Sequence, residues 1–384
     1  MKRAICSVIL IALLFCGCAA KGDAAVQSET EYTTGVWFSY LELDKMLSGD
    51  FKTEFAAAIE NCKTIGITDV FVHIRPFCDS LFNSEYFPLR ETARGLSFDA
   101  MEFMVSIAKQ NNMRFHAWIN PYRVSRETDI NALPNDSPAY KWLNDEDAEN
   151  DCNVLFCDGI YLNPAAPAVQ RLVIDGVREI LEGYDVDGIH FDDYFYPTAD
   201  AEFDRKTYEK YCADTENTLG LADWRRANVN ALISGTYTAV KFYSKDKLFS
   251  ISPAASLQNN YDNLFADVKA WIESDCVDII IPQIYFGFDY PIDEYRFNNL
   301  VEEWKELLNM GNARLMIGLA AYKIGTESEP DRSEWNDNPT LLKRQSVACL
   351  KDSDISGHIY YSYSAIFSDA PQNKAALREI MNTK

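Results

Sequence analysis

The sequence predicts one (β/α)8 barrel, a TIM barrel of the α/β class, behind a short leader and tether. Eight short runs rich in β-branched and aromatic residues occur along the chain. Amphipathic segments at helical spacing separate them. After the leader, about 350 residues remain, which is within the size range of one such barrel. The expected parts are a signal peptide at 1–17, a lipidated cysteine with a flexible tether at 18–33, and the barrel at 34–384.

The first residues have the three-part layout of a secretory signal. Two basic residues precede an apolar run from Ala4 to Phe15, which is too short to span a membrane permanently. Cys18 follows Gly17, and this pair resembles a bacterial lipobox, in which a small residue precedes the cysteine that takes the lipid. We therefore expect lipidation at Cys18 and an exported, membrane-anchored lipoprotein of the bacterial cell envelope. An ordinary cleaved signal is the alternative.

Turn or helix signals bound each of the eight runs, so each is expected to be a strand. The runs are Gly35–Leu41, Asp69–Pro76, Arg114–Pro121, Gly188–Tyr194, Lys247–Ala254, Val277–Phe286, Arg314–Tyr322 and Gly357–Ser364. Helices are expected between them, for example at Phe51–Ile65, Phe98–Asn111, Pro167–Gly183 and Asn299–Met310. Apolar strands that alternate with helices indicate a parallel sheet, and eight such units favour closure into a barrel. A doubly wound open sheet is the alternative.

Charge and cysteine content narrow the class of partner. The formal charge of −22 becomes −24 once the two positive charges of Lys2 and Arg3 are removed, so no nucleic-acid partner is expected. Seven of the ten cysteines follow the leader, and an odd number argues against a complete disulfide framework. Cys152 and Cys157 are near enough in sequence to bridge. No CxxC pair with metal spacing occurs, and no metal or other cofactor is expected. The oligomeric state stays open.

Unusual residues gather where the fourth predicted strand ends, and strand ends form the catalytic face of such barrels. Residues two apart on a strand share a face, so His190 and Asp192 should both point into the lumen. Asp193 should point the other way unless the strand has already turned. A carboxylate there could attack an anomeric carbon or stabilise an oxocarbenium ion. The alternative is that the two aspartates cap the following helix.

Glycoside hydrolysis normally needs a second carboxyl group, one whose raised pKa lets it donate a proton. The residues leave this partner open, with Asp193 and Glu91 ranked above Asp79. Asp192, Asp193 and Glu91 are thus the catalytic candidates. Rings that could stack on sugars, and polar groups that could bind them, complete the site. The expected substrate-binding residues are Arg75, Asp79, Trp118, Asn120, Tyr122, Arg123, His190, Tyr194, Gln283, Tyr285 and Lys323.

Several strings at the predicted strand ends together resemble the glycosyl hydrolase-like 10 family. They are GVW at 35–37, HIRPF at 73–77, HAWINPYR at 116–123, YLNP at 161–164, GIHFDDYFYP at 188–197, SISP at 250–253, PQIY at 282–285 and GLAAYKIG at 318–325. The resemblance implies a TIM barrel in a bacterial envelope protein, often a lipoprotein. It also implies cleavage of peptidoglycan glycan strands that have lost their stem peptides, with a β-1,4 N-acetylhexosamine polymer as substrate.

Asp192 and Asp193 lie in the string at 188–197, so the resemblance implies that the family's acidic site falls on these two residues. The segment 86–91, which ends in Glu91, resembles a stretch where the family also has acidic residues. Cys78 stands where the family tends to have Gly, and Ser252–Ala255 stands where Pro-Phe-Gly is usual. These departures alter loops near the mouth of the barrel and bear on the detail of the substrate.

Three functions compete on these observations. The first is a glycosidase of peptidoglycan or a related glycan, favoured by the signal, the barrel and the two aspartates together. The second is a glycan-binding barrel without catalysis, suggested by the missing second acid. The third is a metal-dependent hydrolase or deacetylase, since His190 and Asp192 share a face. In each case the expected partners are a glycan, and a membrane through the lipid anchor only.

Overall fold

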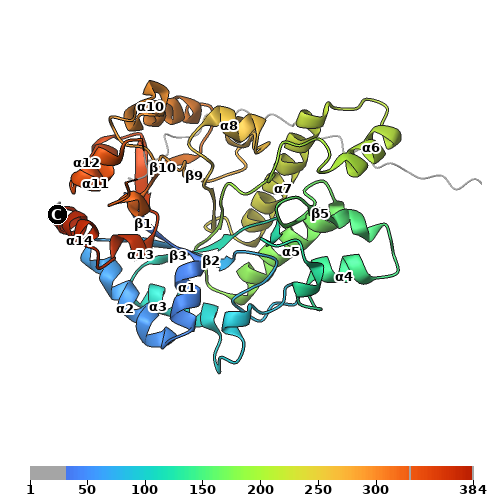
Figure 1. The fold of residues 1–384 in the computed structure, drawn as a ribbon, viewed down its shortest axis with the longest axis horizontal. Helices are drawn as coiled ribbons and strands as arrows, with labels where there is room; N and C mark the ends of the chain where they lie inside the picture. The colour runs from blue at the N-terminus through green and yellow to red at the C-terminus, as the bar shows by residue number, and fades with distance from the viewer. Residues whose placement is uncertain (1–31, 328–329, 383–384) are drawn as a thin grey trace, which may run out of the picture. The chain divides into compact units, whose positions relative to one another are not determined.

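A computed structural model describes residues 32–327 and 330–382. The predicted signal, Cys18 and most of the tether lie outside these residues. Eight parallel strands close into a barrel in the order β1-β2-β3-β7-β8-β9-β10-β11 (Figure 1). Their bounds are β1 (Thr33–Phe38), β2 (Asp69–Arg75), β3 (Arg114–Ile119), β7 (Gly188–Phe191), β8 (Leu248–Ile251), β9 (Ile279–Ile280), β10 (Arg314–Leu319) and β11 (Ile355–Tyr360).

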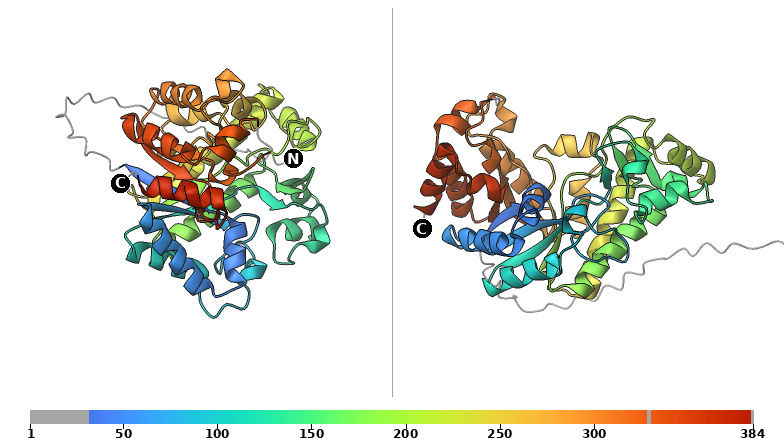
Figure 2. Two further views of the ribbon diagram at one scale, coloured as in Figure 1. Left: turned by 60° about the vertical axis from the view of Figure 1, so that its left-hand side comes forward. Right: turned by 60° about the horizontal axis from the view of Figure 1, so that its bottom comes forward.

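The predicted barrel is confirmed, and the open doubly wound sheet is excluded by the pairing of β1 with β11. In that parallel pair, Gly35 lies opposite Ile359 and Val36 opposite Tyr360. The blue N-terminal and red C-terminal elements accordingly lie next to one another (Figures 1 and 2). Each of the eight predicted strands corresponds to one observed barrel strand.

Helices surround the barrel and alternate with its strands (Figure 2). The four predicted helices are found within two residues of their expected ends. The α-helices of the described residues are α1 (Tyr40–Leu47), α2 (Phe51–Thr64), α3 (Ala100–Gln110), α4 (Pro138–Asn144), α5 (Pro167–Gly183), α6 (Arg205–Asp214), α7 (Leu221–Tyr243), α8 (Leu257–Asp262), α9 (Val268–Glu273), α10 (Phe297–Leu308), α11 (Arg332–Asp337), α12 (Leu341–Lys351), α13 (Tyr363–Ile366) and α14 (Pro371–Met381). Within the described part of the chain, none is long and apolar enough to cross a membrane.

The long connection after β3 contains a small antiparallel sheet that the sequence did not predict. Its order is β4-β6-β5, with β4 (Arg123–Ser125), β5 (Val154–Phe156) and β6 (Ile160–Leu162). Cys152 and Cys157 flank β5. Both thiols are free, so the suggested disulfide is absent. The Cys152 thiol instead lies 3.0 Å from the backbone oxygen of Glu149.

The barrel strands are apolar on both faces, as parallel strands covered by helices require. Val36 and Phe38 of β1 join the large core beneath the helices. Trp37, between them, points to the other face and packs with Phe71 and Met316 inside the barrel. The lumen is therefore filled by side chains, and its upper layer forms the floor of the site described below.

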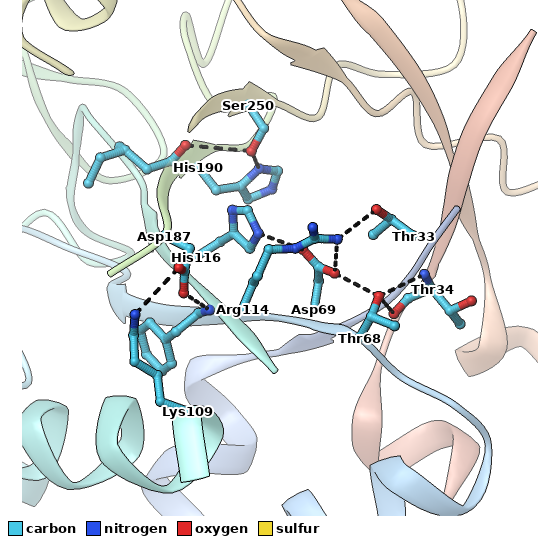
Figure 3. A network of polar contacts seen from close by, with 12 residues as sticks. Thr33, Thr34, Thr68, Asp69, Lys109, Arg114, His116, Asp187, His190 and Ser250 are labelled. Carbon is cyan, nitrogen blue, oxygen red and sulfur yellow. Dashed lines mark hydrogen bonds and ion pairs between the residues drawn. The ribbon is translucent and has the colours of Figure 1, made fainter. Parts of the chain in front are cut away.

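A polar network spans the opposite, amino-terminal end of the barrel (Figure 3). Asp69 at the start of β2 accepts hydrogen bonds from Arg114 Nε at 2.7 Å and pairs with His116 Nε2 at 2.9 Å. Arg114 also donates to Thr33 Oγ1 at 3.0 Å, so the first residues of β1, β2 and β3 are joined. This network lies at the end of the barrel that is not catalytic, where polar contacts serve stability.

Candidate active site

A cleft of about 260 Å³ opens at the carboxyl ends of the strands. Each barrel strand except β2 contributes to the wall of this cleft, either through its own residues or through residues shortly after its end. Two carboxylates and six aromatic rings dominate the lining, which consists of Trp37, Trp118, Asp192, Asp193, Tyr194, Ser252, Gln283, Tyr285, Tyr322 and Tyr361.

Asp192 is the most deeply buried acid of the cleft, at 3 % exposure. One oxygen accepts a hydrogen bond from Trp118 Nε1 at 3.1 Å, and the other accepts one from the Tyr194 backbone N–H at 3.3 Å. Burial, together with the like charge of Asp193, raises the pKa of Asp192 to about 7 despite these two donors. Asp192 can thus hold a proton near neutral pH.

Asp193 also lines the cleft, because β7 ends at Phe191 and the alternation of a strand no longer applies. It is half-buried, and burial raises the pKa of its carboxyl group while a hydrogen bond with Gln283 opposes the shift. Gln283 Nε2 also donates to the Ser252 backbone oxygen at 3.1 Å, which fixes the amide. No other carboxylate is found among the described residues that line this cleft.

His190 lies one layer below the cleft and is fully buried. Its Nε2 accepts a hydrogen bond from Trp37 Nε1 at 3.0 Å, so the proton must sit on Nδ1, which lies 2.8 Å from Ser250 Oγ (Figure 3). Burial, and next the charge of His116, lower the pKa of His190. The neutral imidazole therefore orients the Trp37 indole that forms part of the floor. His358 is buried and pairs with the Tyr32 and Tyr360 hydroxyls.

Trp118, the donor to Asp192, is held by two further rings. His73 of β2 stacks on it with 3.7 Å between ring centroids and 10° between planes. Tyr361 meets it edge-on at 6.5 Å. Arg123 lies near the same group, with its guanidinium carbon 3.9 Å from the centroid of the Tyr194 ring. Its positive charge lowers the pKa of both aspartates, although burial outweighs this effect.

Arg75 is not brought to the cleft. The register between β2 and β3 shifts between His73 and Arg75, so Arg75 leaves the face that His73 occupies. Its guanidinium carbon instead lies 4.2 Å from the Phe87 ring centroid. Nη1 also sits close to Gly176 of α5, where an added Cβ would be 2.5 Å away. This predicted substrate-binding residue thus packs between the barrel and its helices.

Asp79 and Glu91 line a separate pocket beside the β2 and β3 ends. Asp79 forms an ion pair with Arg90 at 2.6 Å, and Arg90 also pairs with Asp44 at 2.7 Å. The Glu91 side chain is 82 % exposed and pairs with Arg94 at 2.7 Å. The structure therefore does not place either carboxylate beside Asp192 and Asp193.

Three other predicted residues do not line the cleft. Asn120 accepts from the Arg123 backbone N–H at 3.3 Å, and both Asn120 and Tyr122 are buried. Lys323 lines an adjoining pocket together with Gln283 and Tyr285. In the described ranges, no three His, Cys, Asp or Glu side chains gather in a way that could hold a metal ion.

The sequence reasoning missed four residues of the cleft, namely Trp37, Ser252, Tyr322 and Tyr361. Tyr361 directly follows β11, and Ser252 directly follows β8. Each of the four lies at or just beyond a strand end, and this position is the signal that could have identified them. The serine and the two tyrosines are of residue types that are common in a barrel core, so type alone does not mark them as part of the site.

A parallel eight-stranded barrel with two carboxylates among aromatic rings at its strand ends is an arrangement typical of glycosidases. The chain is a member of the glycosyl hydrolase-like 10 family, whose model matches residues 33–337. The family and the enzyme class predicted from the sequence are thus confirmed.

Relatives in two bacteria cover nearly the whole chain. It is 32 % identical over 393 residues to glycosyl hydrolase YngK of Bacillus subtilis (strain 168), across 94 % of this chain and 72 % of the relative. It is 28 % identical over 427 residues to glycosyl hydrolase DigH of Escherichia coli (strain K12), across 96 % of this chain and 94 % of the relative.

Solved structures share the barrel at much lower identity. The glycoside hydrolase domain of PgaB (BpsB) from Bordetella bronchiseptica has a TM-score of 0.60 at 15 % identity, covering 92 % of this chain and 99 % of that one. The catalytic domain of β-amylase from Paenibacillus polymyxa has a TM-score of 0.60 at 8 % identity, covering 92 % and 98 %. These likenesses concern the fold.

Proposed function

We propose that this protein hydrolyses glycan strands of peptidoglycan that have lost their stem peptides, with Asp192 and Asp193 as its catalytic carboxyl groups. The observation that carries the proposal is the pair of carboxylates in one aromatic cleft, one of them with a pKa of about 7. Acid-assisted cleavage of a glycosidic bond needs such a pair.

The two aspartates differ in a way that suggests their roles. Two adjacent carboxyl groups in a shared, partly dry site retain a proton between them, and the more buried one holds it more often. That group is Asp192, which we assign as the proton donor to the glycosidic oxygen as the bond to the anomeric carbon breaks. Asp193, more open to solvent, supplies the negative charge that faces the developing positive charge at that carbon, where a water molecule adds and loses its proton to complete the hydrolysis.

The walls of the cleft support a carbohydrate substrate. Tyr285 and Tyr361 lie with ring centroids 6.1 Å apart and planes 23° apart, and Tyr194 is 46 % exposed. Rings of this kind offer apolar faces to the C–H faces of a pyranose while their hydroxyl groups remain wet. The choice of peptidoglycan rests on the family resemblance together with the export signal.

The export signal and Cys18 support a position at the cell envelope. We propose that Cys18 carries the lipid and that the barrel acts on the envelope glycan as an anchored lipoprotein. Substitution of Cys18 by Ser should move the protein from the membrane fraction to the soluble fraction of the envelope. Unchanged membrane retention of that variant would contradict the anchor without touching the enzymatic proposal.

Peptide-free glycan strands, incubated with the purified protein, test the activity directly. We expect shortened saccharides by mass spectrometry from the wild type, and a loss of about 10³-fold or more in rate for Asp192→Asn and Asp193→Asn. Glu91→Gln is the matched control, because this carboxylate lines the separate pocket, and it should retain activity. Loss of activity in Glu91→Gln alone would instead make Glu91 the second acid. Strand binding by the wild type without products would indicate a binding protein.

A further inference from the structure

The hydroxyl group of Ser252 is buried in the wall of the catalytic cleft without a hydrogen-bond partner. Ser252 is 1 % exposed and lines the cleft. Within the described part of the chain, no donor or acceptor lies within hydrogen-bond distance of its Oγ. Buried polar groups nearly always have a partner, because a buried group that lacks one costs free energy. An unpartnered hydroxyl group in the wall of a cleft therefore points to a ligand that enters the cleft.

Ser252 lies in the same layer of the barrel as Asp192. Ser250 and Ser252 are two residues apart at the end of β8, so their side chains share a face. Ser250 lies opposite His190 of β7, and its Oγ is 2.8 Å from His190 Nδ1 (Figure 3). The Ser252 backbone N–H donates to the Phe191 oxygen at 2.9 Å, so this register continues by one residue. Ser250 thus has its partner in the lower layer, whereas the Ser252 hydroxyl group has none in the upper one.

A single amide group connects Ser252 with Asp193. Gln283 Nε2 donates to the Ser252 backbone oxygen at 3.1 Å. The same side chain hydrogen-bonds the Asp193 carboxyl group. Ser252 and Asp193 therefore lie within hydrogen-bond distance of one side chain, and all three residues line the cleft. One small group of a ligand can consequently contact both the Ser252 hydroxyl group and the Asp193 carboxylate.

The backbone around Ser252 is fixed by contacts on both sides of the following turn. The Gln283 backbone N–H donates to the Pro253 oxygen at 3.0 Å. Asn260, which is fully buried, accepts from the Ala254 N–H at 3.1 Å and donates to the Ala254 oxygen at 2.7 Å. The position of the Ser252 hydroxyl group is therefore set before a ligand binds, which lowers the entropic cost of binding.

The groups around this hydroxyl group restrict what it can bind. Asp192 and Asp193 are the only charged residues among the described residues that line the cleft, so an anionic group would be repelled. An atom that contacts the Asp193 carboxylate must donate a hydrogen bond, whereas an atom that contacts a serine hydroxyl group can donate or accept. A hydroxyl-type oxygen meets both requirements with one atom.

We propose that Ser252 is a further member of the active site, and that its hydroxyl group and Asp193 together bind a hydroxyl-type oxygen. This oxygen belongs to the attacking water or to a hydroxyl group of the sugar, and both cases rest on the proposed function. In the first case, the water forms a bond to the anomeric carbon and gives a proton to Asp193. The bond to the glycosidic oxygen breaks, and that oxygen takes the proton of Asp192. Ser252 orients the water and exchanges no proton. In the second case, Ser252 fixes the sugar ring beside the two carboxyl groups.

A crystal structure of the purified protein without substrate tests the site directly. We expect a water oxygen within about 3.2 Å of both Ser252 Oγ and an Asp193 carboxylate oxygen. A Ser252 Oγ that instead hydrogen-bonds another protein group, with no water beside it, would overturn the proposal.

The stability of Ser252→Ala tests whether the hydroxyl group has a structural role. We expect this variant to unfold at the same urea concentration as the wild type, because no protein group loses a partner. Ser356→Ala is the matched control at the amino-terminal end of β11. Its Oγ donates to the Leu315 backbone oxygen at 2.7 Å, so this variant should unfold at a lower urea concentration. Clear destabilisation by Ser252→Ala would indicate a partner within the protein and would contradict the proposal.

Two measurements with peptide-free glycan strands identify the source of the oxygen. For the attacking water, Ser252→Ala should lower kcat about tenfold. Its affinity for strands, measured by calorimetry in an Asp192→Asn background, should then stay unchanged. For a sugar hydroxyl group, this affinity should fall about five- to tenfold. Ser356→Ala should match the wild type in both measurements.

The failure of this proposal and the failure of the proposed function give different results. Cleavage by the wild type, with kcat and strand affinity both unchanged in Ser252→Ala, would overturn the role of Ser252 and leave the proposed function standing. A wild type that cleaves no strand would refute the proposed function. In that case the crystal structure would still decide whether Ser252 and Asp193 share a bound oxygen.

Discussion

The carboxyl group of Asp192 is buried, and its ionisation should make the fold less stable as pH rises. An aspartate in the unfolded chain titrates near 3.8, whereas the folded pKa of Asp192 is about 7. Between these values the folded state binds the extra proton, so the free energy of unfolding falls as pH rises from about 4 to about 7. Active-site residues often have this effect, since function and stability place different demands on them.

Replacing Asp192 by Asn should remove this pH dependence. The variant should gain stability relative to the wild type as pH rises. The gain should be at most about 4 kcal/mol at pH 8, which is the free-energy equivalent of the full pKa shift of Asp192. Urea unfolding at pH 4.5 and pH 8 measures the difference. Asp185→Asn is the control, because Asp185 is 69 % exposed and its pKa is lowered by Lys109 first of all. A stability difference for Asp192→Asn that does not change with pH would show that Asp192 titrates normally.

The same pKa should set the alkaline limit of activity. If Asp192 donates the proton, kcat/KM should fall tenfold per pH unit above about pH 7. The hydrogen bond from Trp118 stabilises the ionised form, so Trp118→Phe should move this limit to higher pH with a modest loss of rate. Rates of saccharide release between pH 4 and pH 9 provide the test. A limit that is unchanged in Trp118→Phe would contradict the assigned donor.

At the residue scale, residue types and their spacing predicted some members of the candidate site and not others. Asp192 and Asp193 were located by their place at a strand end, and both line the cleft. Strict alternation would have turned Asp193 away, but β7 ends at Phe191, and a strand's last residue is among the least certain features of a sequence. Arg75 left the expected face because of a register shift, which depends on pairing with β3.

At the element scale, α5 approaches the barrel at a glycine, and its packing there is tight. A Cβ on Gly176 would lie 2.5 Å from Arg75 Nη1 and 2.6 Å from Phe87 Cε2. Arg75 is 1 % exposed and Phe87 is 4 % exposed, so neither neighbour has room to withdraw. The close approach of helix and strand therefore depends on the missing side chain.

We expect Gly176→Ala to lower the free energy of unfolding by about 1–3 kcal/mol, although alanine favours a helix by up to about 1 kcal/mol. Gly183→Ala is the matched control in the same helix, because nothing lies within 4 Å of an added Cβ there. It should be neutral or stabilising. Denaturant unfolding of the two variants measures the contrast, and equal effects at both positions would contradict the packing constraint.

Elements with a long periodic pattern were predictable, and those without one were not. The pattern of α5 runs over 17 residues and gave both of its ends. The strands β4, β5 and β6 have three residues each, too few for a period of two to be recognised. They are held by pairing with one another across a loop, which is information that a local pattern does not contain.

For the whole molecule, the count and alternation of elements were sufficient to predict a closed barrel. The shape of the site was not predictable in the same way, because the cleft combines residues from Trp37 to Tyr361. Its lining depends on where each strand stops and on how far each loop bends inward. The adjoining pocket, which Lys323 lines, depends in addition on contacts from Asp331 and Glu334 to a loop 44 and 45 residues earlier.

The polar network at the amino-terminal end of the barrel joins three neighbouring strands, β1, β2 and β3. Asp69 is buried, and burial alone would raise its pKa, but hydrogen bonds from His116 and Arg114 lower that pKa to about 2. The folded pKa thus lies below the unfolded value of 3.8. The carboxylate therefore contributes stability above about pH 4, and this contribution is lost as pH falls through about 2.

Asp69→Asn should accordingly lower the free energy of unfolding by about 2 kcal/mol at pH 7, which is the free-energy equivalent of the pKa shift. The difference from the wild type should shrink between pH 4 and pH 2, because both chains then lack the charge. Asp185→Asn should change stability by less than about 0.5 kcal/mol at pH 7, as is usual for exposed ion pairs. Chemical unfolding of the wild type and the two variants between pH 2 and pH 7 measures these differences. A loss in Asp69→Asn that is equally large at pH 2 would show that shape, and not charge, joins β1, β2 and β3 at this end.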